Sequence, residues 1–342
     1  MTQAIVVEGL RKKFGHREVL HGLDFQVERG TVFGVIGPNG AGKTTTMRCL
    51  LDIIRPSSGR VSVLGQDPRQ AGPALRRRIG YLPGELHLEN RTTGRRMLEH
   101  FAAISGPVQR RYVEELAERL DLDLDRQTRK LSKGNKQKLG LLQAFIHRPE
   151  LLVLDEPTSG LDPLVQQQFH AMVREAVDAG ATVFLSSHVL SEVQQAADAV
   201  AILRDGGIVT ISTVEALRTT AVRRLKFNAS GAGMNDVGAL LARVPGVANV
   251  GLREIQADGH ELGAVEATAT LSGQVQPLVQ ELARLNLTDL VLEEPDLEES
   301  VLTLYGGGNP TGNSRGNPGG NVSGNGAGSH AGTVRATGTN HV

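Results

Sequence analysis

A glycine-rich run between an apolar segment and a helical segment constrains this chain more than any other feature. Residues 32–36 are typical of a buried strand, and residues 46–51 are typical of a helix. Between them lies Gly37-Pro38-Asn39-Gly40-Ala41-Gly42-Lys43-Thr44-Thr45. A strand, a glycine loop and a helix in this order are typical of a phosphate-binding P-loop. We therefore expect this chain to bind a nucleoside triphosphate.

The glycine loop has a physical reason to bind phosphate. Its consecutive backbone N–H groups can point at one anion, and the start of the helix adds the positive end of its dipole. Lys43 can reach the β- and γ-phosphates, and the Thr44 hydroxyl is a candidate Mg²⁺ ligand. A chance match is the alternative in a chain with 41 glycines, but the flanking strand and helix disfavour it.

Further motifs follow the P-loop along the chain. Residues 131–135 read Leu-Ser-Lys-Gly-Asn and precede an apolar helical stretch at 139–146. An apolar strand at 151–154 ends in Asp155-Glu156-Pro157, and Ser159-Gly160-Leu161-Asp162 comes next. A second apolar strand, 182–185, is followed by Ser186-Ser187-His188.

The adjacent carboxylates Asp155 and Glu156 are candidates for metal binding and catalysis. Continuous apolar strands are typical of parallel sheets, whose ligands gather at the carboxyl ends of the strands. We therefore expect Asp155 beside the P-loop, holding Mg²⁺ directly or through water, and Glu156 as the general base for an attacking water. Helix capping is the alternative for such a pair, but Pro157 and the P-loop favour catalysis.

These motifs, in this order, resemble those of the nucleotide-binding subunit of an ATP-binding cassette (ABC) transporter, over roughly residues 1–215. The resemblance implies an α/β fold, a P-loop ATPase cassette with a mixed-sheet core, an antiparallel subdomain and a helical lobe. It also implies that His188 is the switch histidine at the γ-phosphate, acting with Lys43 and Glu156. By the same resemblance, Phe14 stacks on adenine and Val19 makes a second contact; a core Phe is the alternative.

Residues 131–135 depart from the family's commonest signature, Leu-Ser-Gly-Gly-Gln, at Lys133 and Asn135. They keep Ser132 and Gly134, which supply a hydroxyl, a close backbone approach and a helix N-terminus. In the family, the signature clamps the nucleotide held by a partner subunit. The resemblance therefore implies a homodimer or a heterodimer with two ATP molecules at its interface.

The loop after residues 79–82 is a second departure. Relatives usually carry a glutamine after the proline, but Gly84 follows Pro83 here. The amide that would touch Mg²⁺ is therefore missing, unless Glu85 substitutes for it. We expect Glu85 to contribute through water, because direct ligation needs an octahedral geometry that a one-residue shift does not favour.

Composition agrees with a cytoplasmic enzyme. Lys+Arg and Asp+Glu are balanced at 37 each, so no electrostatic argument favours nucleic acid as a partner. The single cysteine, Cys49, excludes a disulfide within the chain. The N-terminus is too poor in apolar residues for a signal peptide, and no stretch approaches the ~18 apolar residues of a membrane span. We expect a peripheral protein on the cytoplasmic face of the membrane, attached through a separate permease.

Three domains are expected. Residues 1–220 form the ABC ATP-binding domain, and residues 221–305 follow a βαββαβ pattern that a ferredoxin-like fold would give. By resemblance to drug- and antibiotic-export ATPases, this small α+β domain is regulatory or stabilises the dimer. Residues 306–342 contain five Asn-x-x-Gly units and almost nothing apolar, and we expect them to be disordered.

The function that these features favour is ATP hydrolysis in the service of an exporter with a separate permease. The main alternative is a soluble ABC ATPase that acts mechanically on ribosomes or DNA. Ribosome-acting relatives normally carry two cassettes, and DNA-repair relatives carry a long coiled coil between P-loop and signature; this chain has neither feature. A small-molecule P-loop kinase is disfavoured by the signature together with His188.

Overall fold

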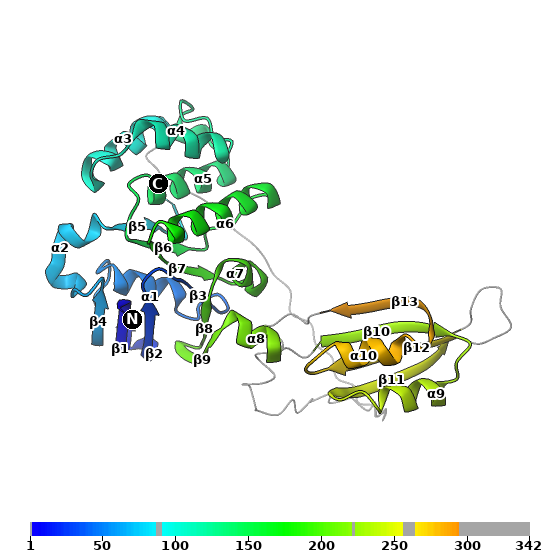
Figure 1. Cartoon of the computed structure of the whole chain (residues 1–342). Coiled ribbons are helices and arrows are strands. Elements are labelled where there is room, and N and C mark those ends of the chain that lie inside the picture. Colours follow the sequence, from blue (N-terminus) through cyan, green and yellow to red (C-terminus); the bar gives the residue numbers. More distant parts are fainter. Residues whose placement is uncertain (1, 87–90, 221–222, 256–263, 294–342) are drawn as a thin grey trace, which may run out of the picture. The chain divides into compact units, whose positions relative to one another are not determined.

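The computed structural model describes residues 2–86, 91–220, 223–255 and 264–293. The chain has an N-terminal region, residues 2–220, and a C-terminal region, residues 223–293 (Figure 1). The expected repeat tail at 306–342 lies outside the described residues.

A six-stranded sheet forms the centre of the N-terminal region (Figure 1). Five strands are parallel and the last is antiparallel, in the spatial order β5 (Ile79–Leu82), β6 (Leu151–Asp155), β7 (Thr182–Ser187), β3 (Val32–Ile36), β8 (Ala199–Arg204) and β9 (Gly207–Thr213). Strands β3, β6 and β7 are buried along their whole length. This is the expected mixed-sheet core, and a sheet covered on both faces explains why its strands read as continuous apolar runs.

Successive residues of the central strands enter two separate cores. On β7, Val183 and Leu185 belong to one core and Phe184 to the other. This division follows from the geometry of a strand, in which neighbouring side chains point to opposite faces. The strands are therefore held from both sides, which fixes where their carboxyl ends lie.

A three-stranded antiparallel sheet packs into the second core, as expected. Its spatial order is β2 (Arg17–Glu28), β1 (Gln3–Phe14) and β4 (Ser58–Val63). Helix α1 (Lys43–Leu50) shares this core through buried residues that include Met47 and Leu50. The helix that follows the glycine loop is thereby anchored to two sheets.

Helices pack into the first core, and several of them gather into a lobe at one end of the region (Figure 1). The lobe contains α3 (Gly94–Ser105), α4 (Arg110–Arg119) and α5 (Lys133–Phe145). The other helices of this region are α2 (Pro68–Arg76), the short 3₁₀ turn Thr128–Lys130, α6 (Pro163–Asp178), α7 (Leu190–Ala196) and α8 (Val214–Thr220). The expected helical lobe is thus present.

Two helices begin within the motifs, where helix N-termini were expected from the sequence. Helix α1 begins at Lys43, ahead of the apolar stretch that starts at residue 46, and α5 begins at Lys133, ahead of the stretch that starts at residue 139. Their first turns consist of polar motif residues and carry no apolar periodicity. Both the P-loop and the signature therefore lie at helix N-termini, where backbone N–H groups lack intrahelical partners.

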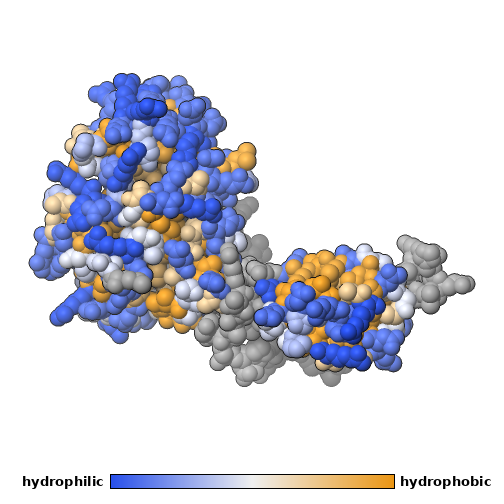
Figure 2. Space-filling view, viewed as in Figure 1, coloured by the Kyte–Doolittle hydropathy of each residue, from blue (hydrophilic) through white to orange (hydrophobic). Residues whose placement is uncertain are grey.

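Polar side chains predominate over α3 and α4 on the face shown in Figure 2. Within the described ranges, the structure contains no helix with the length and apolar character of a membrane span.

The C-terminal region follows the expected βαββαβ order. Its elements are β10 (Arg223–Ser230), α9 (Met234–Leu241), β11 (Val247–Ile255), β12 (Ala264–Leu271), α10 (Gln276–Leu282) and β13 (Asn286–Glu293). The strands form one antiparallel sheet in the order β11-β12-β10-β13, with a core of its own around Phe227 and Leu241. This topology is ferredoxin-like.

The second core contains three stacked aromatic rings. Truncating one of them tests how much this core contributes to the stability of the fold. Phe25, Phe33 and Phe184 have ring centroids 5.8–5.9 Å apart, and Phe184 is fully buried. We predict that Phe184→Ala lowers the free energy of unfolding by about 3–5 kcal/mol, since it removes a buried ring and leaves a cavity. Phe14→Ala is the control, because Phe14 is half-exposed and its truncation should change urea unfolding far less. Equal losses in the two variants would contradict the prediction.

Candidate functional site

The glycine loop joins β3 to α1 and shapes a cradle of backbone. Gly40 and Gly42 adopt φ values of +86° and +108°, which favour glycine. Residues 37–42 form the loop, while Thr44 and Thr45 lie in the first turn of α1. The start of α1 has no side-chain cap and no acidic residue in its first turn. Its free N–H groups and positive dipole end therefore suit a phosphate.

Lys43 is buried in this cradle. Its Nζ donates to the carbonyl oxygen of Gly37 at 2.6 Å and lies 3.4 Å from that of Pro38. The third neighbour is a carboxylate oxygen, Oε1 of Glu156, at 3.3 Å. The ammonium group is thus held between the P-loop and the end of β6, where it can neutralise phosphate charge.

Asp155 is the last residue of β6 and is fully buried. Oδ1 of its carboxylate accepts a hydrogen bond from the Ser186 hydroxyl at 2.6 Å. The other oxygen, Oδ2, is buried without a hydrogen-bond partner in the described structure. An unpaired buried carboxylate oxygen is costly. The residues present therefore fit a divalent cation, with the Thr44 hydroxyl in the first turn of α1 as a second candidate ligand.

Glu156 follows Asp155 in a left-handed conformation, with φ of +50°. This conformation is uncommon outside glycine, and it marks a strained position. Oε2 of Glu156 lies 2.6 Å from Nδ1 of His188, which donates as an N–H, and the Glu156 carboxylate also contacts Lys43. His188 is half-exposed. The three predicted catalytic residues, Lys43, Glu156 and His188, therefore meet around one carboxylate.

Two residues that the sequence patterns did not single out hold the end of β6. The Glu156 N–H donates to Oγ of Ser186 at 3.0 Å, and the buried Gln137 amide donates to the carbonyl oxygens of Glu156 and Pro157, each at 3.0 Å. Ser186 lies opposite Asp155 in the parallel β6–β7 register. The signal for Ser186 in the sequence was a polar residue near the end of a strand whose middle is apolar.

A further carboxylate joins the segments on either side of this site. Oε2 of Glu192 accepts hydrogen bonds from the hydroxyls of Thr158, at 2.6 Å, and Ser187, at 3.0 Å. Thr158 lies two residues after Glu156, and Ser187 precedes His188. Helix α7 therefore ties together the two loops that lead away from β6 and β7.

The predicted signature residues lie at the start of α5. Oγ of Ser132 accepts a hydrogen bond from the Asn135 N–H at 3.2 Å and caps the helix. A Cβ atom at Gly134 would lie 2.9 Å from the carbonyl oxygen of Gly160, so only glycine fits this close approach. Among the described residues, no hydrogen bond or ion pair joins Ser132 or Gly134 to Lys43, Asp155, Glu156 or His188. The signature is therefore not joined by any such contact to the cluster around Glu156 in the same chain.

The two predicted adenine contacts lie on the β1–β2 hairpin. Phe14 is half-exposed at the end of β1, with Nζ of Lys12 4.8 Å from its ring centroid. The Val19 carbonyl oxygen lies 3.5 Å from the position of a Cβ atom at Gly42, so this residue adjoins the P-loop. An exposed ring with a cation on one side is available for stacking and is not a core residue.

Gly84 lies beside the unpaired Asp155 oxygen. A Cβ atom at position 84 would lie 3.1 Å from Oδ2 of Asp155 and 3.3 Å from its Cγ. Burial, with the Asp155 charge next in importance, raises the pKa of the nearby Tyr81. Glu85 is exposed and forms no hydrogen bond or ion pair with any residue that the structure describes. The approach to Asp155 on this side is therefore lined by a residue without a side chain.

Protein side chains alone do not form a metal cage here. Within the described ranges, no group of three or more His, Cys, Asp or Glu residues could hold an ion. A site that combines one carboxylate, one hydroxyl and phosphate oxygens is the arrangement that Mg²⁺ usually adopts in phosphate-transferring proteins. The donor set of Thr44 and Asp155 is of this kind.

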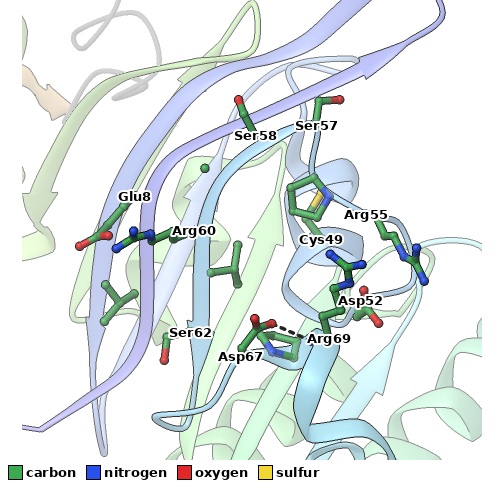
Figure 3. A pocket seen from close by; sticks show the side chains of 15 residues that line it. Glu8, Cys49, Asp52, Arg55, Ser57, Ser58, Arg60, Ser62, Asp67 and Arg69 are labelled. Atoms are coloured by element: carbon green, nitrogen blue, oxygen red, sulfur yellow. Dashed lines mark hydrogen bonds between the residues drawn. The ribbon is translucent and has the colours of Figure 1, made fainter.

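An open cavity of about 690 Å³ lies elsewhere in the N-terminal region (Figure 3). It contains none of the predicted site residues. Its charged lining residues are three arginines and three carboxylates, namely Arg55, Arg60, Arg69, Glu8, Asp52 and Asp67. Cys49 also lines it, and burial raises the pKa of this thiol to about 11. The balanced charges of this cavity give no preference for the anion that the P-loop favours.

Comparison with known proteins identifies relatives along most of the chain. The model of a family described as ABC transporter matches residues 20–159. The daunorubicin resistance ATP-binding protein DrrA3 of Streptomyces coeruleorubidus is 37% identical over 311 residues, which cover 89% of this chain and 96% of that protein. The bacitracin transport ATP-binding protein BcrA of Bacillus licheniformis is 31% identical over 315 residues, with 90% and 99% covered.

Solved structures share the fold of the N-terminal region. An ATP-binding subunit of an ABC transporter superposes with a TM-score of 0.59 at 29% identity, covering 63% of this chain and 92% of that one. A bacterial Atm1-family ABC exporter with ATP bound has a TM-score of 0.57 at 26% identity, covering 63% of this chain and 39% of the exporter.

The position of Gly84 leads to a test of the metal site. We predict that Gly84→Ala raises the Mg²⁺ concentration for half-maximal ATP hydrolysis roughly tenfold, because its Cβ crowds the Asp155 oxygen. Gly84→Gln adds the same Cβ and also an amide. A smaller rise in Gly84→Gln than in Gly84→Ala is expected if that amide ligates the ion.

Glu85→Ala, titrated in parallel, tests whether the neighbouring carboxylate contributes through water. We expect it to raise the Mg²⁺ concentration for half-maximal ATP hydrolysis less than Gly84→Ala does. Magnesium curves that coincide with wild type in all three variants would show that this loop has no metal role.

Proposed function

This chain belongs to the ABC transporter family as an ATP-hydrolysing, ATP-binding subunit, and from that premise we propose that it energises an exporter through Mg²⁺-dependent closure of a two-site dimer. One observation carries the proposal: the Glu156 carboxylate lies within 3.3 Å of Lys43 and 2.6 Å of His188, directly after Asp155. The resistance and transport roles in the names of DrrA3 and BcrA support export.

The P-loop binds the triphosphate of ATP in this proposal. Backbone N–H groups of the glycine loop and of the first turn of α1 surround the phosphates, and Lys43 neutralises the β- and γ-phosphates. Phe14 stacks on adenine, and Val19 contacts the nucleotide beside Gly42. Mg²⁺, when bound by Thr44 and Asp155, neutralises charge that develops on the phosphate oxygens.

Glu156 is the proposed general base. An ionised carboxylate can accept the proton of an attacking water, and its neighbours fix its direction. Because Nδ1 of His188 donates to Glu156, the other ring nitrogen is free to face the γ-phosphate. His188 then senses whether the γ-phosphate is present.

Dimerisation completes the site. Ser132 and Gly134 lie at the positive end of α5, and Ser132 is exposed. A helix N-terminus with a hydroxyl suits a γ-phosphate, so we propose that these two residues close over the ATP of a partner subunit. The partner is either a second copy or a related chain.

ABC ATP-binding subunits act with transmembrane permeases. We propose that the permease here is a separate chain and that the ATPase docks to it on the cytoplasmic face of the membrane. Closure of the ATP-bound dimer moves the permease, and hydrolysis reopens the dimer. The C-terminal region, with a core of its own, is proposed to regulate or stabilise this dimer.

Lys43→Ala tests the nucleotide site. We predict that it lowers ATP hydrolysis at least about a hundredfold, because it removes the charge that stabilises the phosphates. Lys226→Ala is a matched control outside the N-terminal region, and it should hydrolyse ATP at the wild-type rate. Substantial turnover by Lys43→Ala would exclude the P-loop assignment.

Glu156→Gln tests the base and the dimer together. We predict that hydrolysis falls at least about a hundredfold while ATP still binds, since the amide cannot accept the proton. The variant should therefore accumulate as an ATP-bound dimer in gel filtration with Mg-ATP. A variant that stays monomeric where wild type dimerises would count against the two-site closure.

A further inference from the structure

The hydroxyl of Ser186 lies between the two carboxylate residues at the end of β6. It donates to Oδ1 of Asp155 at 2.6 Å and accepts the Glu156 N–H at 3.0 Å. Ser186 is fully buried at the end of β7, opposite Asp155 in the strand register. We infer that Ser186 is a positioning residue that orients Asp155 as a one-oxygen metal ligand and holds Glu156 in its left-handed turn.

The first half of this inference follows from the chemistry of a hydroxyl. Ser186 has one proton and accepts on its lone pairs. Because Asp155 offers only acceptors when ionised and the Glu156 N–H is only a donor, the proton of Ser186 is directed to Asp155. Oδ1 is thereby occupied, and Oδ2 is the oxygen that remains for a cation. Hydrogen bonds to a ligating carboxylate fix its orientation and contribute to metal affinity.

The second half concerns the backbone of Glu156. A φ of +50° is unfavourable for a residue other than glycine, unless its surroundings hold it. Ser186 holds the N–H of this residue, and Gln137 holds its C=O. The turn sends the carboxylate towards Lys43 and His188. The Ser159 N–H also donates to the Glu156 C=O, at 3.2 Å. Loss of the Ser186 hydroxyl therefore removes the hydrogen bond that holds the N–H side of the Glu156 backbone.

The inference rests on the proposed function. It assigns the positioning role to Ser186 and not to its neighbour, Ser187. The Ser187 hydroxyl donates to Glu192 and accepts the Val189 N–H, and in the described structure it forms no hydrogen bond with Asp155 or Glu156. Position 186 requires one group that both donates and accepts. Alanine fulfils neither role, and cysteine fulfils both weakly.

Ser186→Ala is the test, with two readouts. Mn²⁺ binding in the presence of a non-hydrolysable ATP analogue, followed by electron paramagnetic resonance, should weaken roughly tenfold. The kcat at saturating metal should also fall roughly tenfold, while the affinity for metal-free ATP stays within about twofold, because the P-loop is untouched. Ser186→Cys should lie between alanine and wild type in both measurements.

Thr182→Val is the matched control on the same strand. It removes a buried hydroxyl that accepts the Gly30 N–H, at the opposite end of β7 from the site. It should keep the wild-type Mn²⁺ affinity. Thermal unfolding of both variants shows whether a loss of stability alone explains a loss of Mn²⁺ affinity or of kcat in Ser186→Ala.

Wild-type Mn²⁺ affinity and kcat in Ser186→Ala, with a wild-type protein that behaves as proposed, would overturn this inference alone. A wild-type protein that does not bind ATP would overturn the proposed function and this inference with it.

Discussion

A single turn of backbone allows two neighbouring carboxylates to serve one site, and the rest of the structure depends on it. Successive side chains of a strand point to opposite faces, so Asp155 and Glu156 would diverge if β6 continued. The left-handed conformation at Glu156 ends the strand and directs its carboxylate towards Lys43. The proposed metal ligand and the proposed base therefore come from adjacent positions without sharing an orientation.

The two cores make this turn possible. Because β6 and β7 are buried on both faces, their register cannot slip by one residue without moving apolar side chains out of a core. That register places Ser186 beside Asp155. Gly34 contributes to the same rigidity, since a Cβ atom there would lie 2.2 Å from Val193 of α7. Packing away from the P-loop thus determines how Asp155 and Ser186 are placed beside it.

Much of this arrangement could be predicted from the sequence, because motif residues are local. The P-loop, the carboxylate pair at the end of β6 and the histidine after β7 each follow an apolar strand whose carboxyl end lies at one sheet edge. The role of Ser186 could not be predicted, since it depends on which strands are neighbours and on their register. The proximity of Gly84 to Asp155 depends on the same tertiary contacts. The first turns of α1 and α5 could be expected only from their motifs, because their polar residues carry no apolar periodicity.

The amide of Gln137 joins α5, the helix that begins with the signature, to the segment that directly follows β6. It binds the carbonyl oxygens of residues 156 and 157, which any amino acid possesses at these positions. Replacement of the Glu156 side chain therefore leaves this joint intact. The connection between α5 and the end of β6 therefore does not depend on the side chain of the proposed base. In the proposed dimer, a subunit in which Glu156 is replaced would keep this connection although it no longer hydrolyses ATP.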